Sequence, residues 1–396
     1  MSVRADLGRA EVRGICAPRF APVLEAFRRN FAELGELGGG VCVTHDGEVV
    51  VELVGGVADE LTGRLWDERT LVMVWSATKG ALATCVHLLA ASGELDVDAP
   101  IARWWPEFAA AGKGAIPVAM ALNHQAGVPG LSAPLAPDRV FDFDEMTARV
   151  AAQAPLWEPG TRHGYHSFTF GWILGELVRR ATGLTPGRFL AEQVAAPLGL
   201  DLWIGLPEAE HGRVARVRSL PLAPGGDDPF GDAVARGAPI QTAVVNSWGR
   251  FADAGVCQLP DARTAEVPAA NGFATARGLA LLYRPLATDG RFGDVQLPAR
   301  MRARMGSVES AAACDAVRLE PTRFASGFEK GTLGGLAHGL AMPEDAFGHA
   351  GQGGSYGLAD PLRRLSIGFV TNAHIVQGQE QRAQGLVDAA YASLRT

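Results

Sequence analysis

Strand-like segments near both ends of the chain, with helical patterns between them, limit its folds more than any other feature. Residues 41–45 and 48–54 are rich in β-branched side chains and flank Asp46-Gly47, a dipeptide typical of a type I′ hairpin turn. Residues 365–372 are typical of a further strand. We therefore expect an α/β fold of the α+β type, whose sheet is assembled from both chain ends and is flanked by helices.

Helical patterns indicate how the rest of the chain is divided. Residues 19–35 have an amphipathic pattern, and residues 379–394 are expected to form a final helix beside the last strand. Between residues 101 and 270, helical patterns alternate with loops rich in proline and glycine. We predict an α/β domain made of residues 1–100 and 271–396, with an inserted helical domain of residues 101–270.

Composition and charge exclude several classes of protein. The 396 residues are 47% hydrophobic and 20% charged, which is ordinary for a globular protein. The net charge of -7 argues against a nucleic-acid-binding surface. The sequence contains neither a signal-peptide pattern nor a run of about 18 apolar residues, the length that a membrane-spanning helix needs. We expect a cytoplasmic protein that binds neither nucleic acid nor membranes.

Cysteines and histidines give no sign of a metal site. The histidines lack His-x-x-x-His spacing on a helix, and the cysteines lack Cys-x-x-Cys spacing. We expect neither a metal nor a cofactor, and the sequence leaves a homo-oligomer open. The five scattered cysteines are Cys16, Cys42, Cys85, Cys257 and Cys314.

A Ser-x-x-Lys motif, Ser76 to Lys79, lies where an apolar run meets the helical pattern of residues 81–89. If the helix starts at about Ser76, the two side chains lie one turn apart on the same face. An amine whose pKa is lowered by burial can accept the serine proton, and N–H groups at a helix start add positive charge. The alternative is a capped helix with a solvated lysine. Because Lys113 and Lys330 are the only other lysines, a specific role for Lys79 is favoured.

Tyr165 is a second candidate. It lies between the turn residues 158–161 and the helical pattern of residues 168–182, a place from which a side chain can project into a cleft. A phenolate held near ammonium groups can act as a base around neutral pH. The alternative is a half-buried tyrosine whose hydroxyl makes only a structural hydrogen bond.

The glycine-rich residues 349–357 are the third candidate. Glycines let a strand lie close to a substrate, and an N–H of this strand could pair with the N–H of Ser76 as an oxyanion hole. His349 would then face the cleft. The alternative is a histidine in an ordinary glycine-rich turn.

Together the three elements resemble the serine β-lactamase and penicillin-binding-protein superfamily, on the branch of class C β-lactamases, D-alanyl-D-alanine peptidases and family VIII carboxylesterases. The resemblance covers about residues 20–392 and implies a β-lactamase/transpeptidase-like fold, with an antiparallel sheet and an inserted, mainly helical lobe. The matching motifs are Ser76-Ala77-Thr78-Lys79, Tyr165-His166-Ser167 and His349-Ala350-Gly351, with connecting segments at residues 93–100, 122–127, 158–161 and 197–200.

The resemblance implies an acyl-enzyme mechanism without a metal or cofactor. Ser76 attacks an acyl carbon, and Lys79 with Tyr165 moves protons from the serine and to the leaving group. The N–H groups of Ser76 and Gln352 hold the oxyanion, and water then releases the acyl group.

Four residues are candidates for binding the substrate. His349 and Gly351 belong to the third motif, and His166 is next to Tyr165. Trp248 follows the turn-rich residues 223–238, which we expect to form a surface loop or lid, and is a candidate to line an acyl pocket.

Two departures from the family pattern bear on the substrate. Ser167 stands where the tyrosine motif has asparagine, and His349 replaces the lysine of Lys-Thr-Gly. That lysine faces the substrate carboxylate in β-lactam enzymes, whereas a histidine is mostly neutral at pH 7. We therefore predict a carboxylesterase for short- to medium-chain neutral esters. The alternatives are a β-lactamase or D-alanyl-D-alanine peptidase, an acyltransferase, and a non-catalytic scaffold relative, against which the intact Ser76, Lys79 and Tyr165 argue.

Ser355 is an alternative nucleophile, because residues 353–357 fit the Gly-x-Ser-x-Gly pattern of α/β-hydrolases. That pattern requires a helix directly after the serine and an acid and a histidine well downstream. Asp360-Pro361 and a strand-like segment follow instead, and His374 is the only later histidine. Ser76 is therefore favoured over Ser355.

Overall fold

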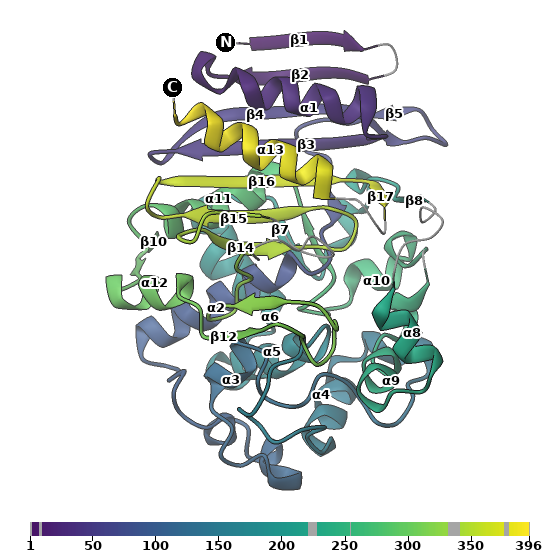
Figure 1. Ribbon diagram of the computed structural model, residues 1–396, viewed down its shortest axis with the longest axis vertical. Helices are drawn as coiled ribbons and strands as arrows, with labels where there is room; N and C mark the ends of the chain where they lie inside the picture. Colours follow the sequence, from purple (N-terminus) through teal and green to yellow (C-terminus); the bar gives the residue numbers. More distant parts are fainter. Residues whose placement is uncertain are drawn as a thin grey trace.

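Strands from both ends of the chain form one antiparallel sheet (Figure 1). The computed structural model describes residues 2–7, 10–220, 228–253, 255–331, 341–375 and 380–395. The sheet order is β1-β2-β4-β3-β16-β15-β14, and β3 from the N-terminal part pairs with β16 so that Val43 lies opposite Ile367. This confirms the expected sheet. Its strands are β1 Ser2–Leu7, β2 Ala10–Cys16, β3 Gly38–His45, β4 Glu48–Asp59, β5 Arg64–Leu65 (paired with β4), β14 Phe347–Ala350, β15 Tyr356–Asp360 and β16 Leu365–Thr371.

The turn between β3 and β4 has the predicted hairpin geometry. Asp46 and Gly47 have φ angles of 53° and 88°. A type I′ turn needs positive φ at both central positions, which asparagine, aspartate and glycine adopt most readily. The prediction of a hairpin here is therefore confirmed.

Helices cover both faces of the sheet (Figure 1). Helices α1 (Ala21–Glu33) and α13 (Glu380–Ser393) contact each other on one face, where Phe27, Leu386 and Phe369 share an apolar cluster. Helix α11 (Ala276–Ala287) lies on the other face against β3, β15 and β16. Its approach to β16 is so close that a Cβ at Gly368 would lie 2.3 Å from the Ala276 carbonyl oxygen.

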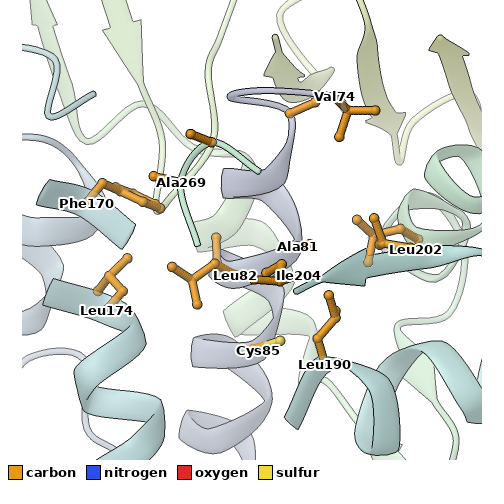
Figure 2. Close-up of a cluster of buried hydrophobic side chains, with 14 of the residues drawn as sticks. Val74, Ala81, Leu82, Cys85, Phe170, Leu174, Leu190, Leu202, Ile204 and Ala269 are labelled. Carbon is orange, nitrogen blue, oxygen red and sulfur yellow. The ribbon is translucent and has the colours of Figure 1, made fainter. Parts of the chain in front are cut away.

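Helix α2 (Thr78–Ser92) is surrounded by apolar side chains (Figure 2). Val74 before the helix and Leu82 within it lie among Phe170, Leu190 and Leu202 from other segments. Its residues from Thr78 to Leu89 are all buried, as expected for a helix without a polar face. The helix ends at Gly93, whose φ of 81° gives the left-handed C-cap that glycine adopts without strain.

The remaining elements form the lower part of Figure 1 and the connections to the sheet. Strand β7 pairs with β9, and the largest apolar cluster includes side chains from both parts of the chain, so the division into two domains stays a prediction. The α-helices are α3 Val118–Leu122, α4 Phe143–Ala152, α5 Thr169–Thr182, α6 Pro186–Leu190, α7 Ala196–Leu198, α8 Pro229–Ala235, α9 Pro239–Asn246, α10 Pro260–Thr264 and α12 Ala299–Gly306. The short strands are β6 Val72–Met73, β7 Leu202–Ile204, β8 Arg218–Leu220, β9 Gly272–Ala274, β10 Arg291–Phe292, β11 Val295–Gln296, β12 Ser310–Ala312, β13 Thr322–Phe324 and β17 Ala373–Ile375. The 3-10 helices are Pro18–Phe20, Ile101–Arg103, Pro106–Gly112, Pro137–Phe141, Glu208–Arg213, Gly249–Ala252 and Val256–Gln258, and Ala191–Ala195 is a π-helical turn.

Helix α8, residues 229–235, lies where the sequence predicted a loop. We expected residues 223–238 to be a loop, but helix α8 occupies part of this run, and residues 223–227 lie outside the described residues. The Asp228 side chain accepts a hydrogen bond of 2.9 Å from the Gly231 N–H, and Pro229 occupies the first turn. Aspartate and proline at these positions are helix-start signals that resemble loop signals in sequence.

No helix among the described residues has both the length and the apolar character needed to cross a lipid bilayer.

Candidate active site

The turn that leads into α2 holds Ser76 in a constrained backbone. Trp75 has a φ of 48°, which is uncommon for a residue other than glycine and costs free energy that its surroundings must offset. The Thr78 hydroxyl fixes this turn, because it donates to the Trp75 carbonyl and accepts the Gly272 N–H at 2.8 Å. The regular helix starts two residues later than predicted, yet the Lys79 N–H still donates to the Ser76 carbonyl at 2.9 Å. Ser76 is half-buried and thus remains in reach of solvent.

Lys79 lies one turn after Ser76 and is fully buried. Its Nζ is 3.0 Å from Ser76 Oγ, 2.7 Å from the Ser167 carbonyl oxygen and 3.0 Å from the Ala269 carbonyl oxygen. Burial lowers the pKa of Lys79 well below its ordinary value near 10.5, and the negative charge of Glu329 opposes this only in part. A deprotonated amine has two N–H groups for the two carbonyls and a lone pair for the serine proton.

Tyr165 lies beside this pair, in the loop before α5. The Lys79 Nζ is 4.9 Å from the centroid of its ring, and the Tyr165 N–H donates to both carboxylate oxygens of Asp315 at 3.1 Å. Burial raises the pKa of the Tyr165 hydroxyl, and the positive charge of Arg318 opposes that rise. No well-aligned partner for this hydroxyl exists among the described residues, although Ser76 and Arg318 are near enough to lower its pKa slightly. The protonated phenol is therefore favoured over the phenolate near neutral pH.

The third predicted segment approaches the start of α2 closely. A Cβ on Gly351, just beyond β14, would lie 2.0 Å from the Val74 carbonyl oxygen, so only glycine fits without a shift. Gln352 lies in the turn that follows, with its side chain exposed. In the described part of the chain, the N–H groups of Ser76 and Gln352 donate to no backbone carbonyl. Both are free to donate to a ligand oxygen.

His349 is buried at the Tyr165 side of this segment. The centroids of the His349 and Tyr165 rings are 6.1 Å apart, and His349 Nδ1 lies 2.8 Å from the Ala350 carbonyl oxygen. Burial lowers the pKa of His349 to about 4, although Glu329 acts in the opposite direction. The ring is therefore neutral at pH 7, as expected for a histidine in this position.

Three charged residues near Tyr165 were not predicted from the sequence. The Arg318 guanidinium carbon lies 3.8 Å from the centroid of the Tyr165 ring, and its Nη2 is 2.8 Å from Glu329 Oε1. Asp315 is fully buried and accepts the N–H groups of Tyr165 and Arg318, at 3.1 and 2.8 Å. No motif connects these residues with Tyr165, which is 150 residues away from Asp315, so residue spacing could not indicate their proximity.

His166 was predicted to bind substrate, and the structure contradicts this. Its ring is fully buried, with Nε2 accepting the Val128 N–H at 3.1 Å and Nδ1 within 2.7 Å of the Gly164 carbonyl oxygen. Both nitrogens are thus used to hold the backbone around Tyr165. The residue was predicted only because it is next to Tyr165 in sequence, and successive side chains of an extended loop point in different directions.

Trp248 packs near Tyr165, whereas Ser355 lies in the interior of the protein. Trp248 is half-buried, stacks on Phe230 with ring centroids 5.7 Å apart, and packs on the apolar cluster that contains Tyr165. Ser355 is fully buried, leads into β15 rather than a helix, and its Oγ accepts the Thr371 N–H at 3.3 Å. The surroundings that a Gly-x-Ser-x-Gly nucleophile requires are therefore missing around Ser355.

The described residues contain no cluster of three or more histidine, cysteine, aspartate or glutamate side chains that could hold a metal ion.

Known proteins show the same architecture. The chain is 34% identical over 381 residues to the esterase/beta-lactamase LipL of Mycobacterium tuberculosis, covering 93% of this chain and 84% of LipL. Among solved structures, a penicillin-binding protein homolog from Caulobacter crescentus and a family VIII carboxylesterase are each 36% identical, with TM-scores of 0.85 and 0.84. Each match covers 96% of this chain and 99% of the other. The family model described as Beta-lactamase matches residues 27–391, and the chain therefore belongs to the beta-lactamase family of serine hydrolases.

Proposed function

We propose that the protein is a carboxylesterase that cleaves neutral esters of short to medium chain length through an acyl group on Ser76. The observation that carries this proposal is the environment of the Lys79 amine. Two carbonyl oxygens accept its N–H groups when it is neutral, and Ser76 Oγ lies at the remaining position, 3.0 Å away. Because burial lowers the pKa of Lys79, the amine is ready to accept the serine proton near neutral pH.

The proposed reaction has two stages. Ser76 Oγ bonds to the ester carbonyl carbon while its proton moves to Lys79, and the oxyanion is bound by the N–H groups of Ser76 and Gln352. The C–O bond to the alcohol then breaks, and the leaving oxygen takes a proton from the Tyr165 hydroxyl, which Lys79 replenishes. In the second stage water bonds to the acyl carbon while its proton moves to Lys79; the bond from this carbon to Ser76 Oγ then breaks, and Lys79 returns the proton to Ser76 Oγ as the carboxylic acid is released.

The neutral state of His349 supports esters over β-lactams. A permanent cation at this position would attract the carboxylate that most β-lactams carry, whereas a buried histidine with a pKa of about 4 carries no charge at pH 7. The binding of an ester without a carboxylate is not weakened when a neutral histidine replaces that cation. Trp248, which packs on the cluster around Tyr165, is proposed to line the pocket for the acyl chain.

β-Lactam hydrolysis is the second candidate, because the relative LipL is an esterase/beta-lactamase by name. The decisive experiment offers p-nitrophenyl butyrate and a chromogenic cephalosporin in parallel to wild type and Ser76→Ala. We expect ester turnover by wild type, at least about a thousandfold less by Ser76→Ala, and little cephalosporin turnover. Full ester turnover by Ser76→Ala would disprove the mechanism, and efficient cephalosporin turnover would reverse the substrate preference. A phosphonate probe with peptide mapping separately distinguishes Ser76 from Ser355.

A further inference from the structure

An ion pair between Arg318 and Glu329 borders the candidate site. Arg318 lies over the ring of Tyr165, and Glu329 joins it to the His349 segment. The Glu329 Oε2 accepts the Ala350 N–H at 3.1 Å and lies 3.6 Å from His349 Nδ1. The side chains are only 17% and 9% exposed, so solvent screens this pair far less than a surface pair.

Both members of the pair are held by the backbone. The Glu329 N–H and carbonyl pair with Gly348 in β14, at 2.7 and 3.1 Å, which places its carboxylate next to His349. The Arg318 N–H donates to the buried carboxylate of Asp315 at 2.8 Å. The backbones of both residues are therefore fixed next to the site.

The two charges act on the same catalytic groups with opposite sign. Glu329 raises the pKa values of Lys79, Tyr165 and His349, while Arg318 lowers all three. Burial raises the pKa of Glu329, but the Arg318 guanidinium and the Ala350 N–H oppose this, and the pKa lies below its ordinary range, so that Glu329 is ionised. With Lys79 and His349 neutral, the positive charge of Arg318 is offset by its ion-pair partner Glu329 and by the nearby Asp315 carboxylate.

We propose that Glu329 is a built-in counter-ion that determines specificity: it neutralises Arg318 and so excludes acyl donors that carry a carboxylate near the scissile bond. This proposal rests on the proposed function, because it concerns the same site. A substrate carboxylate has to compete with Glu329 for Arg318, and it is repelled by Glu329 at short range. Without the charge of Glu329, the Arg318 guanidinium loses the ion-pair partner at its Nη2 and becomes available to a substrate carboxylate.

The test compares two acetate esters that differ in one charge, 4-acetoxybenzoate and its methyl ester. Glu329→Gln keeps the size of the side chain and an oxygen for the Ala350 N–H, but removes the charge. We expect kcat/KM for the anionic ester relative to the methyl ester to rise roughly tenfold over wild type, mainly through KM. The matched control is Glu344→Gln, which neutralises the exposed partner of Arg323 and should leave the ratio within about twofold.

Two further variants assign the effect to Arg318. The double variant Arg318→Met/Glu329→Gln should return the ratio toward the wild-type value, because no unpaired cation remains. Arg318→Met alone leaves an uncompensated Glu329 and should lower the ratio below wild type. An unchanged ratio in folded Glu329→Gln, or a gain that persists in the double variant, overturns the proposal. If circular dichroism shows that Glu329→Gln does not fold, Arg318→Met replaces it as the test. A ratio below wild type in Arg318→Met then supports the proposal, and an unchanged ratio overturns it.

Binding measurements separate this proposal from the proposed function. In the Ser76→Ala background, 4-acetamidobenzoate and its methyl ester are titrated by NMR with and without Glu329→Gln. We expect the anion to bind roughly tenfold more tightly when Glu329 is neutral, with little change for the methyl ester. If wild type hydrolyses neither acetate ester, the proposed function fails, but the two affinities still support or overturn the role of Glu329.

Discussion

Lys79 and Lys113 are both fully buried, yet their surroundings differ in one respect. The Lys113 Nζ donates to three backbone carbonyls, which take all three N–H groups of an ammonium. The Lys79 Nζ has two carbonyls and the Ser76 hydroxyl. Since a hydroxyl can also donate, Lys79 loses no hydrogen bond when it becomes neutral, whereas a neutral Lys113 would leave one carbonyl without a donor.

Burial alone therefore does not distinguish a base from a structural cation. It lowers the pKa of both lysines, and it lowers that of Lys79 well below the ordinary value. The set of partners decides which protonation state the fold supports. Three carbonyls support the ammonium, whereas two carbonyls and a serine support the amine that the proposed reaction needs.

Replacing Lys79 and Lys113 in turn tests this difference directly, and Lys79→Met should give the largest predicted effect on activity. Lys79→Met should lower kcat/KM for p-nitrophenyl butyrate by about a thousandfold, because the serine loses its proton acceptor. Lys113→Met should change kcat/KM less than about threefold, but it should reduce the free energy of unfolding by roughly 3 kcal/mol, because three carbonyls lose their donor. Steady-state kinetics and urea denaturation measure the two quantities. Equal activity losses in the two variants would show that Lys79 acts only by supporting the fold.

The dependence on pH gives the next largest effect. Lys79 can accept a proton only when deprotonated, so kcat/KM should fall tenfold per unit as pH drops below the pKa of Lys79, and stay level above it. Because burial holds this pKa well below 10.5, the level region should extend well below the pH at which an ordinary lysine loses its proton. Tyr165 stays protonated there, since burial raises its pKa. Profiles from about pH 5 to about pH 9 test this.

Two outcomes would contradict that expectation. Activity that still rises tenfold per unit through the alkaline range would mean that Lys79 keeps the pKa of an ordinary lysine. A shift of the acidic limb in Lys113→Met would mean that the limb reports a property of the whole fold. The limb should stay in place in Lys113→Met, because no described bond joins that lysine to Ser76 or Tyr165.

The sequence predicted those features that depend on local geometry. A separation of three residues places Ser76 and Lys79 on one side of a helix turn, and Asp46-Gly47 has the backbone preference of a hairpin turn. The sheet followed from where the strand-like segments lie. In the helix turn and the hairpin, neighbours in sequence determine the geometry, so that residue type and spacing are sufficient.

Distant contacts that no recognisable motif marks were missed. Nothing in the spacing of Asp315, Arg318 and Glu329 indicates that they meet Tyr165, because the fold alone brings these segments together. The role assigned to His166 was wrong for the same reason. Its proximity to Tyr165 in sequence did not determine where its ring points, and the backbone groups of Val128 and Gly164 occupy both nitrogens.

The smallest predicted effect tests this distant part of the site. Besides Tyr165 and Arg318, the Asp315 carboxylate accepts the Val317 N–H at 2.7 Å and the Thr322 hydroxyl at 3.0 Å. In Asp315→Asn an amide replaces one oxygen, so at least one of these bonds weakens and Tyr165 is held less firmly. We expect kcat to fall roughly tenfold with little change in KM, and the free energy of unfolding to fall by about 1–3 kcal/mol.

The control for Asp315→Asn is Asp142→Asn, which alters the residue that caps α4 by accepting the Glu145 N–H at 3.0 Å. Asparagine is also a good cap, so stability should change by less than about 1 kcal/mol and kcat should stay at the wild-type value. If Asp315→Asn lost stability but kept its kcat, the carboxylate would hold the fold without positioning Tyr165. Loss of kcat in the folded variant would instead show that the position of Tyr165 depends on its contact with Asp315, 150 residues away in sequence. The contact between Ser76 and Lys79, in contrast, lies within a single helical turn.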